Sequence, residues 1–236
     1  MTEFKKLSMH NTINLVIFDC DGVLVDSEIL SQRVLLNMLE KVGVVVSEDY
    51  FLTHFLGFNF EHVTAKVFAD FSVTLTSEFR QSYRAALINV FETELQQTHQ
   101  LESVLSQLNV GSCVATSGSP EKVKHSLHYT NLEQYFDDRV FTSSEVKNGK
   151  PAPDLFLHAA EKMGVSAQNC LVIEDSNAGV AAALAANMHV IRYTGASHLK
   201  NKNITIQMNE RVSTIDHWQQ LFKTVPSLSS SLKIER

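Results

Sequence analysis

The sequence has no apolar run close to the roughly 20 residues that a helix needs to cross a bilayer. It also lacks a basic tract, and its formal net charge is −6, so we expect no binding site for a nucleic-acid backbone. Residues 1–11 carry some positive charge, but no signal-peptide core follows them. These absences predict a cytoplasmic protein that has neither membrane nor nucleic-acid partners.

Cysteine is also scarce. The three residues Cys20, Cys113 and Cys170 show no C-x-x-C spacing, which argues against a zinc site and favours buried, reduced thiols. No internal repeat and no low-complexity linker interrupts the 236 residues, of which 44% are hydrophobic. This content is enough to bury a full core, either as one large domain or as two unequal ones.

Short apolar runs and amphipathic segments alternate along most of the chain. The predicted strands are Leu15–Asp19, Ser112–Thr116, Arg139–Thr142, Cys170–Glu174 and His189–Tyr193. The predicted helices between them are Gln100–Leu108, Glu121–His128, Asp154–Met163 and Ala178–Ala186. Alternation of this kind predicts an α/β fold with a doubly wound parallel sheet.

One interval, from Ser27 to about Glu94, has only helical periodicity. Ser47, Asn59 and Thr76 each precede an amphipathic stretch, in the position of a helix N-cap. Because this interval directly follows the first strand, we expect an inserted all-α cap over the crevice. The expected division is a discontinuous core of residues 1–26 and 95–225, a helical cap of residues 27–94, and a frayed serine-rich tail of residues 226–236.

Acidic side chains end two of the predicted strands. Asp19 and Asp21 follow the first strand, one residue apart, and Glu174 and Asp175 end the fourth. Ligands of open α/β sheets bind beyond the carboxyl ends of the strands. Clustered anions repel each other, so they need a cation or a shifted protonation state to coexist. The pattern therefore indicates chemistry at this edge of the sheet.

Two further segments add groups suited to phosphate. Thr116 and Ser117 end a strand with hydroxyls and exposed backbone N–H groups. Lys150 lies between Gly149 and Pro151, which suggests a fixed backbone path.

Each of these features has a plainer interpretation. The first two acids can cap a turn, the hydroxyls can belong to an ordinary turn, the lysine can lie in a solvated loop, and the last two acids can cap the following helix.

In this order, the segments resemble the motifs of the haloacid-dehalogenase-like (HAD) hydrolase superfamily, over nearly the whole chain. The nearest branch is that of sugar-phosphate phosphatases and β-phosphoglucomutase relatives, which carry a small helical cap. Asp19-Cys-Asp21-Gly22-Val is similar to motif one, Thr116 to motif two, Lys150 to motif three and Glu174-Asp175 to motif four. The resemblance implies a Rossmann-like core and a Mg²⁺-dependent hydrolase of phosphate monoesters.

The resemblance also implies roles. Asp19 would be the nucleophile that forms an aspartyl-phosphate, and Asp21 the general acid and base. Thr116, Ser117 and Lys150 would contact the phosphate. The implied ligands of Mg²⁺ are Asp19, the backbone carbonyl of Asp21, Asp175 and, directly or through water, Glu174.

In the cap, Leu56-Gly57-Phe58-Asn59 resembles the family's cap loop that reaches the substrate. Gly57 is therefore a candidate substrate contact, although it can simply stop a helix. Ser27 and Glu28 face the crevice mouth by their position. Arg33 and Arg84 are candidates for contacting an anionic substrate, with exposed helix surface as the alternative.

Several activities remain open on this fold. β-Phosphoglucomutases carry a histidine and an arginine where this chain has Ser31 and Phe58, so hydrolysis is favoured over phosphate reorientation. A phosphonate hydrolase would need a Schiff-base lysine, and neither cap lysine, Lys41 or Lys66, lies in a resembling motif. A non-catalytic phosphate-binding or partner-binding module is a further alternative. The expected ligand is a sugar, sugar-acid or polyol phosphate, bound by a monomer or weak dimer.

Overall fold

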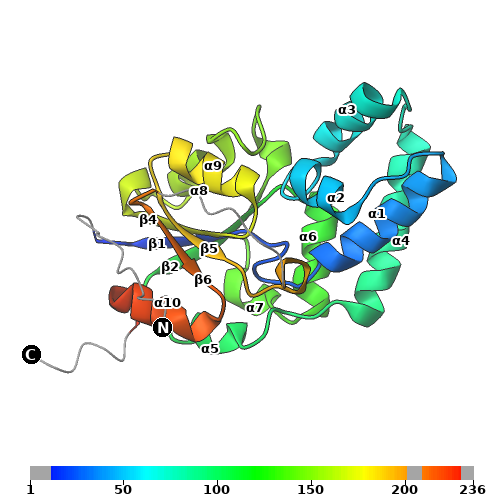
Figure 1. Ribbon diagram of the computed structural model, residues 1–236. Helices are drawn as coiled ribbons and strands as arrows, with labels where there is room; N and C mark the ends of the chain where they lie inside the picture. The colour runs from blue at the N-terminus through cyan, green and yellow to red at the C-terminus, as the bar shows by residue number, and fades with distance from the viewer. Residues whose placement is uncertain (1–11, 201–208, 230–236) are drawn as a thin grey trace, which may run out of the picture.

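The computed structural model describes residues 12–200 and 209–229, which form a parallel sheet flanked by helices, with a helical layer at one end (Figure 1). The strands are β1 (Leu15–Phe18), β2 (Gly111–Thr116), β3 (Val140–Thr142), β4 (Cys170–Glu174), β5 (His189–Tyr193) and β6 (Val212–Ile215). Their order is β3-β2-β1-β4-β5-β6, and every neighbouring pair is parallel. The predicted α/β sheet is confirmed.

Strand β1 lies between β2 and β4, and all four of its residues are buried. Leu15 and Ile17 join the hydrophobic cluster on one face of the sheet, and Val16 and Phe18 join the cluster on the other. This division follows from the alternation of side chains along a strand, and it explains why the run is continuously apolar. The strand order reverses direction between β1 and β4, where doubly wound sheets bind their ligands.

Helices cover both faces of this sheet. The core helices are α5 (Leu101–Leu105), α6 (Pro120–Tyr129), α7 (Glu133–Phe136), α8 (Asp154–Lys162), α9 (Asn177–Ala185) and α10 (Leu221–Thr224). Short 3₁₀ turns occupy Ser143–Glu145, Ala167–Asn169, Ser197–Leu199, Trp218–Gln220 and Pro226–Leu228. Helices α8 and α9 lie on one side of the sheet, and α5, α7 and α10 on the other (Figure 1).

The segment after β1 is helical throughout, as predicted. It contains α1 (Glu28–Lys41), α2 (Glu48–His54), α3 (Phe60–Phe71) and α4 (Ser77–Glu94), which we call the cap helices. The side chains of Ser47, Asn59 and Thr76 accept the N-cap hydrogen bonds of α2, α3 and α4, so these three predicted helix starts are confirmed.

The cap helices share a hydrophobic cluster of their own, which includes Leu39, Phe51 and Val67. The lower parts of α1 and α4 join the core cluster instead, through residues such as Val34 and Phe91. The division of the chain at residues 26/27 and 94/95 stays a prediction.

The structure differs from the expectations at several elements. Strand β6 and helix α7 are not predicted, because each has only four residues and no clear periodicity. The predicted helix 100–108 is limited to Leu101–Leu105, and several predicted strand ends move by one residue, which is the usual uncertainty of such boundaries.

The expected frayed tail is wrong for residues 226–229. Pro226–Leu228 forms a 3₁₀ turn, because the Leu228 side chain is fully buried in the core cluster. Residues 230–236 lie outside the described part of the chain.

The three cysteines are buried and unpaired, in agreement with the sequence. Within residues 12–200 and 209–229, no helix combines the length and the apolar character needed to span a bilayer.

Candidate active site

Asp19 directly follows β1 at the carboxyl edge of the sheet. Its backbone N–H donates to the carbonyl of Ile173 on β4 at 3.0 Å, so the backbone continues the strand pairing while the side chain emerges at the crevice. The carboxylate is only 4% exposed. Burial raises the pKa of Asp19, and the nearby Lys150 ammonium opposes that rise.

Lys150 lies beside this carboxylate, although it is far away in the sequence. Its Nζ donates to Asp19 Oδ1 at 2.7 Å and to Glu174 Oε1 at 2.8 Å. Burial acts to lower the pKa of Lys150, but the carboxylates of Asp19 and Glu174 outweigh it and raise the value. The lysine is therefore a permanent positive charge between two buried acids.

Glu174 and Asp175 end β4 next to Asp19. Each of the three carboxylates offers an oxygen, and these oxygens lie within 4.8 Å of one another. Glu174 Oε2 also accepts hydrogen bonds from the backbone N–H of Ser176, at 2.6 Å, and from its hydroxyl, at 2.9 Å. Burial, followed by repulsion from Glu174, raises the pKa of Asp175.

One oxygen of this cluster is unsatisfied. Asp175 Oδ2 is buried and accepts no hydrogen bond from any described residue. It lies 2.9 Å from His198 Nε2, but the geometry is not that of a hydrogen bond, and burial lowers the pKa of His198 so that the ring is neutral. An unpaired buried oxygen in a set of three carboxylates is suited to a hard divalent cation such as Mg²⁺.

Gly22 lets the backbone approach this cluster. Its φ is +73°, a conformation that favours glycine, and a Cβ here would overlap Asp175 Oδ2. The D-x-D-G pattern therefore has a steric reason in this fold.

Thr116 and Ser117 follow β2 on the other side of β1. Thr116 Oγ1 accepts a hydrogen bond from the Gly118 backbone N–H at 3.1 Å. Ser117 Oγ donates to the backbone carbonyl of Gly57 at 3.0 Å, and Ser143 Oγ donates to the Ser117 carbonyl at 3.1 Å. The turn is thus connected both to the loop after β3 and to the cap loop.

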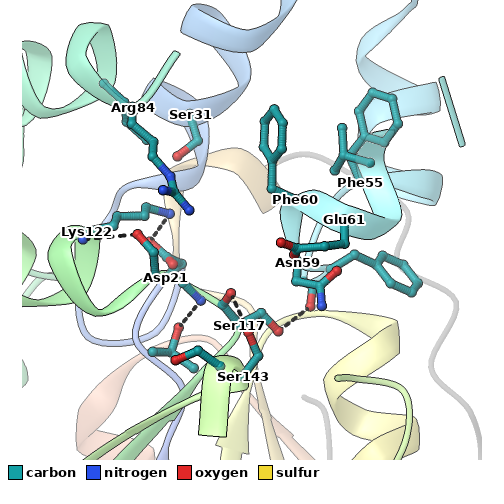
Figure 2. Close-up of a pocket in the computed structure, with 18 of the residues that line it drawn as sticks. Asp21, Ser31, Phe55, Asn59, Phe60, Glu61, Arg84, Ser117, Lys122 and Ser143 are labelled. Carbon is teal, nitrogen blue, oxygen red and sulfur yellow. Dashed lines mark hydrogen bonds and ion pairs between the residues drawn. The ribbon is translucent and has the colours of Figure 1, made fainter. Parts of the chain in front are cut away.

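Asp21 lies at the cavity wall beside Lys122 (Figure 2), and its carboxylate has two partners. Ser27 Oγ donates to Asp21 Oδ1 at 2.5 Å, and Lys122 Nζ lies 2.8 Å from the same oxygen. Glu28 is also buried there, and burial, followed by repulsion from Asp21, raises the pKa of Glu28 to about 8. Glu28 lines the cavity, as predicted from its position, whereas Ser27 is fully buried behind Asp21 and is not among the lining residues.

Sequence reasoning missed Lys122. Burial acts to lower the pKa of this lysine, but Asp21 and Glu28 outweigh it and raise the value, so its ammonium stays charged. The sequence offered one weak signal: Lys122 lies in the first turn of α6, where the helix dipole disfavours a cation unless an acid compensates for it.

Core and cap together enclose a cavity of about 430 Å³. Asp19, Asp21, Thr116 and Ser117 line it from the core, whereas Lys150, Glu174 and Asp175 are not among its lining residues. The cap contributes residues from α1, α2, α3 and α4 and from the loop before α3, some of which Figure 2 shows.

The candidate cap residues have different positions. Gly57 lines the cavity with φ +80°, and a Cβ there would overlap Ser176 Oγ, so the cap loop packs tightly on the core. Arg84 lines the cavity, as proposed for a substrate contact. Arg33 is not among the lining residues and pairs with Glu94 at 2.7 Å on the surface, which corresponds to the plainer interpretation.

Comparison with known proteins agrees with this geometry. A family model described as haloacid dehalogenase-like hydrolase matches residues 16–193, a range that contains every candidate residue of the four motifs.

Two characterised relatives cover most of the chain. The 6-phosphogluconate phosphatase of Escherichia coli (strain K12) is 32% identical over 210 residues, which is 89% of this chain and 93% of that protein. Hexitol phosphatase A of the same strain is 32% identical over 184 residues, covering 74% of this chain and 80% of that protein.

Among solved structures, a conserved haloacid dehalogenase-like protein of unknown function from Agrobacterium tumefaciens str. C58 has a TM-score of 0.72 at 29% identity. The match covers 91% of this chain and 98% of that one.

Proposed function

The chain belongs to the haloacid dehalogenase-like hydrolase family, and we propose that it hydrolyses the monoester of a small phosphorylated sugar, sugar acid or polyol. The observation that carries this proposal is the Asp19 carboxylate, which lines an enclosed cavity and is surrounded by Lys150, Glu174 and Asp175. One of the two relatives is named a 6-phosphogluconate phosphatase and the other a hexitol phosphatase.

In the first step, a carboxylate oxygen of Asp19 attacks the phosphorus atom of the monoester. The new bond joins Asp19 to phosphorus, and the bond from phosphorus to the ester oxygen breaks. Asp21 gives its proton to the departing alkoxide, so the alcohol leaves neutral.

In the second step, water attacks the phosphorus of the aspartyl-phosphate. Asp21, now ionised, accepts a proton from this water, and the bond from phosphorus to Asp19 breaks. Inorganic phosphate leaves, and both carboxyl groups return to their starting states. Ser27 and Lys122 both contact Oδ1 of Asp21 and so orient its side chain.

Donors around the phosphate offset the negative charge that develops on its oxygens. Thr116 and Ser117 line the same cavity as Asp19, and Thr116 Oγ1 and the Ser117 N–H would contact two of these oxygens. Lys150 offsets the charge of Asp19 and Glu174 from behind.

Mg²⁺ fits the cluster, because Asp19 and Asp175 offer hard oxygen ligands and Asp175 Oδ2 accepts no hydrogen bond from any described residue. Asp19, the backbone carbonyl of Asp21 and Asp175 would hold it, with Glu174 a direct or water-mediated ligand. When bound, the ion supplies positive charge that lets two anions, the carboxylate and the phosphate, approach each other.

Phosphate reorientation within a mutase is the less favoured reaction. Ser31 and Phe58, at the positions where β-phosphoglucomutases carry a histidine and an arginine, line the cavity. Neither side chain carries a charge that could hold a second phosphate while the intermediate changes its orientation. Water therefore reaches the aspartyl-phosphate, and hydrolysis results.

The proposal is tested with Asp19→Asn. We expect release of inorganic phosphate from p-nitrophenyl phosphate and from sugar phosphates to require Mg²⁺, and to fall by at least about 1,000-fold in this variant. Asp138→Asn is the matched control, because Asp138 is exposed before β3, at the opposite edge of the sheet. Wild-type turnover in folded Asp19→Asn would refute the nucleophile, and absence of metal-dependent release from the native protein would refute the activity.

A further inference from the structure

Arg84 extends from α4 into the cavity (Figure 2). The side chain is half-buried, and among the described residues no carboxylate forms an ion pair with it. An arginine stays protonated in proteins. A partly buried guanidinium without an acid is unusual, because its charge is then compensated only by solvent.

The other arginines of the cap helices are paired. Arg33 pairs with Glu94 at 2.7 Å. Arg80 pairs with Glu61 at 2.7 Å and also lies over the Phe60 ring. Arg80 and Arg84 line the same cavity. Glu61 neutralises the guanidinium of Arg80, whereas the guanidinium of Arg84 is available to bind an anionic ligand.

A second feature lies on the same side of the cavity. Ser31, on α1, is 4% exposed, lines the cavity, and its Oγ has no hydrogen bond of good geometry to any described residue, although the Tyr83 hydroxyl is near. Helices α1 and α4 pack against each other, and Figure 2 shows Ser31 and Arg84 both on the cap side of the cavity. An unsatisfied buried hydroxyl is costly unless a ligand completes it.

The other unassigned cations that line the cavity, Lys122 and Lys147, add no uncompensated charge on its cap side. Lys122 is neutralised by Asp21 at 2.8 Å, and Lys147 is exposed on the loop after β3, where solvent and salt screen its charge. The cap side therefore offers one net positive charge and one hydroxyl donor.

We propose that Arg84 and Ser31 bind a carboxylate at the end of the substrate remote from its phosphate, so that the preferred substrate is a phosphorylated sugar acid. This inference rests on the proposed phosphatase function and specifies its substrate class. The planar guanidinium fork matches the two oxygens of a carboxylate, and Ser31 donates a further hydrogen bond.

A carboxylate fits this subsite better than a second phosphate. A carboxylate carries one negative charge, which a single guanidinium neutralises. A second phosphate carries almost two at neutral pH, and a single guanidinium would leave part of that charge uncompensated.

Two substrates of the same length separate the carboxylate from all other contacts. 6-Phosphogluconate and glucitol 6-phosphate share the phosphate and the hydroxylated chain and differ only at carbon 1, which is a carboxylate or a hydroxymethyl group. We expect the native protein to hydrolyse 6-phosphogluconate with a kcat/KM roughly 10-fold or more above that for glucitol 6-phosphate, and added salt to reduce this preference.

The variant Arg84→Gln should lower kcat/KM for 6-phosphogluconate by roughly 30-fold, mainly through KM, and change that for glucitol 6-phosphate by less than about twofold. Arg84→Lys should restore part of the preference, because it keeps the charge and loses the fork. Ser31→Ala should give a smaller loss that is likewise confined to the acid. Arg33→Gln, which removes a cap arginine outside the cavity, should leave both substrates unchanged.

Each other result overturns the inference. An equal loss for both substrates in Arg84→Gln would make Arg84 a structural residue, and native protein that prefers glucitol 6-phosphate would exclude a carboxylate subsite even if Arg84→Gln failed to fold. A preference for fructose 1,6-bisphosphate over 6-phosphogluconate, lost in Arg84→Gln, would assign the subsite to a second phosphate. In all three cases phosphate is still released, so the proposed function stands. No metal-dependent release from any compound, including p-nitrophenyl phosphate, would remove both.

Discussion

In the proposed reaction Asp21 acts first as a general acid and then as a general base. Both of its side-chain partners contact the same carboxylate oxygen, Oδ1. Oδ1 accepts from Ser27 at 2.5 Å and lies 2.8 Å from Lys122 Nζ. With Oδ1 occupied, Oδ2 is the oxygen left for exchanging a proton with the substrate. Lys122 is thus a positioning residue, which acts through Asp21 and not on the substrate.

Lys122→Met should therefore lower kcat by roughly 10- to 100-fold with little change in KM, because the side chain of Asp21 loses its fixed orientation. Lys124→Met is the matched control on the same helix, since Lys124 is exposed, and it should behave like the native protein. Steady-state kinetics of phosphate release check both. A rise in KM with unchanged kcat would mean that Lys122 binds substrate directly.

At the residue scale, the sequence predicts the functional side chains that lie at or directly after the end of a strand. Thr116 and Glu174 each end a strand and Asp19 directly follows one, so a local pattern identifies both the residue and its place at the sheet edge. Lys122, Ser31 and His198 lie on helices or in a 3₁₀ turn, and their orientation depends on what those elements pack against. No local pattern specifies that, so sequence reasoning missed Lys122 and His198 and left Arg84 undecided.

At the scale of elements, the cap helices begin where their capping side chains lie. Ser47, Asn59 and Thr76 each accept a hydrogen bond from a backbone N–H three residues later, which satisfies one donor of the free first turn. Ser27 precedes α1 but makes no such bond, because its hydroxyl is committed to Asp21. Helix α1 therefore lacks a side-chain N-cap hydrogen bond, because Ser27 binds Asp21 instead.

Thr76→Ala should lower the free energy of unfolding by about 1 kcal/mol, since it removes the N-cap of α4. Ser82→Ala, an exposed position within the same helix, should change it by less than about 0.5 kcal/mol. Urea denaturation followed by circular dichroism measures the difference. Equal effects of the two substitutions would show that the cap hydrogen bond contributes nothing to α4.

Elements with long periodic patterns or capping residues were predictable, and short ones were not. Helices α3 and α4 have an apolar stripe and a cap residue, whereas β6 has four residues, and its place in the sheet comes from pairing with β5. Leu228, in the expected tail, is likewise buried through packing against residues that are distant in the sequence. Its immediate neighbours in the sequence do not determine its position.

At the scale of the whole molecule, the cap and the sheet share a hydrophobic cluster. Leu30 and Val34 of α1 and Leu87 and Phe91 of α4 belong to the same cluster as Phe18 of β1. Helices α1 and α4 therefore pack into the core cluster, although the cap also has a hydrophobic cluster of its own.

We expect core and cap to unfold in one transition. Trp218, the only tryptophan, is buried and stacks on Tyr193 with ring centroids 4.5 Å apart, so its fluorescence reports the core. Far-UV circular dichroism reports all helices, of which α4 and α1 are the longest. The two urea curves should coincide. A dichroism change that precedes the fluorescence change would mean that the cap melts separately.

The central position of β1 has a consequence during synthesis. The ribosome delivers Asp19 early, but Lys150 follows 131 residues later, and β4 is made later still. Asp19, the proposed nucleophile, therefore lacks its ammonium partner until Lys150 is made, and β1 lacks one of its two neighbours until β4 is made. Since chains emerge from the amino terminus, a prematurely terminated product that stops just before β4 contains Asp19 and Lys150 but lacks Glu174 and Asp175. Without these two acids the proposed metal site is incomplete, so we expect such a fragment to release no phosphate.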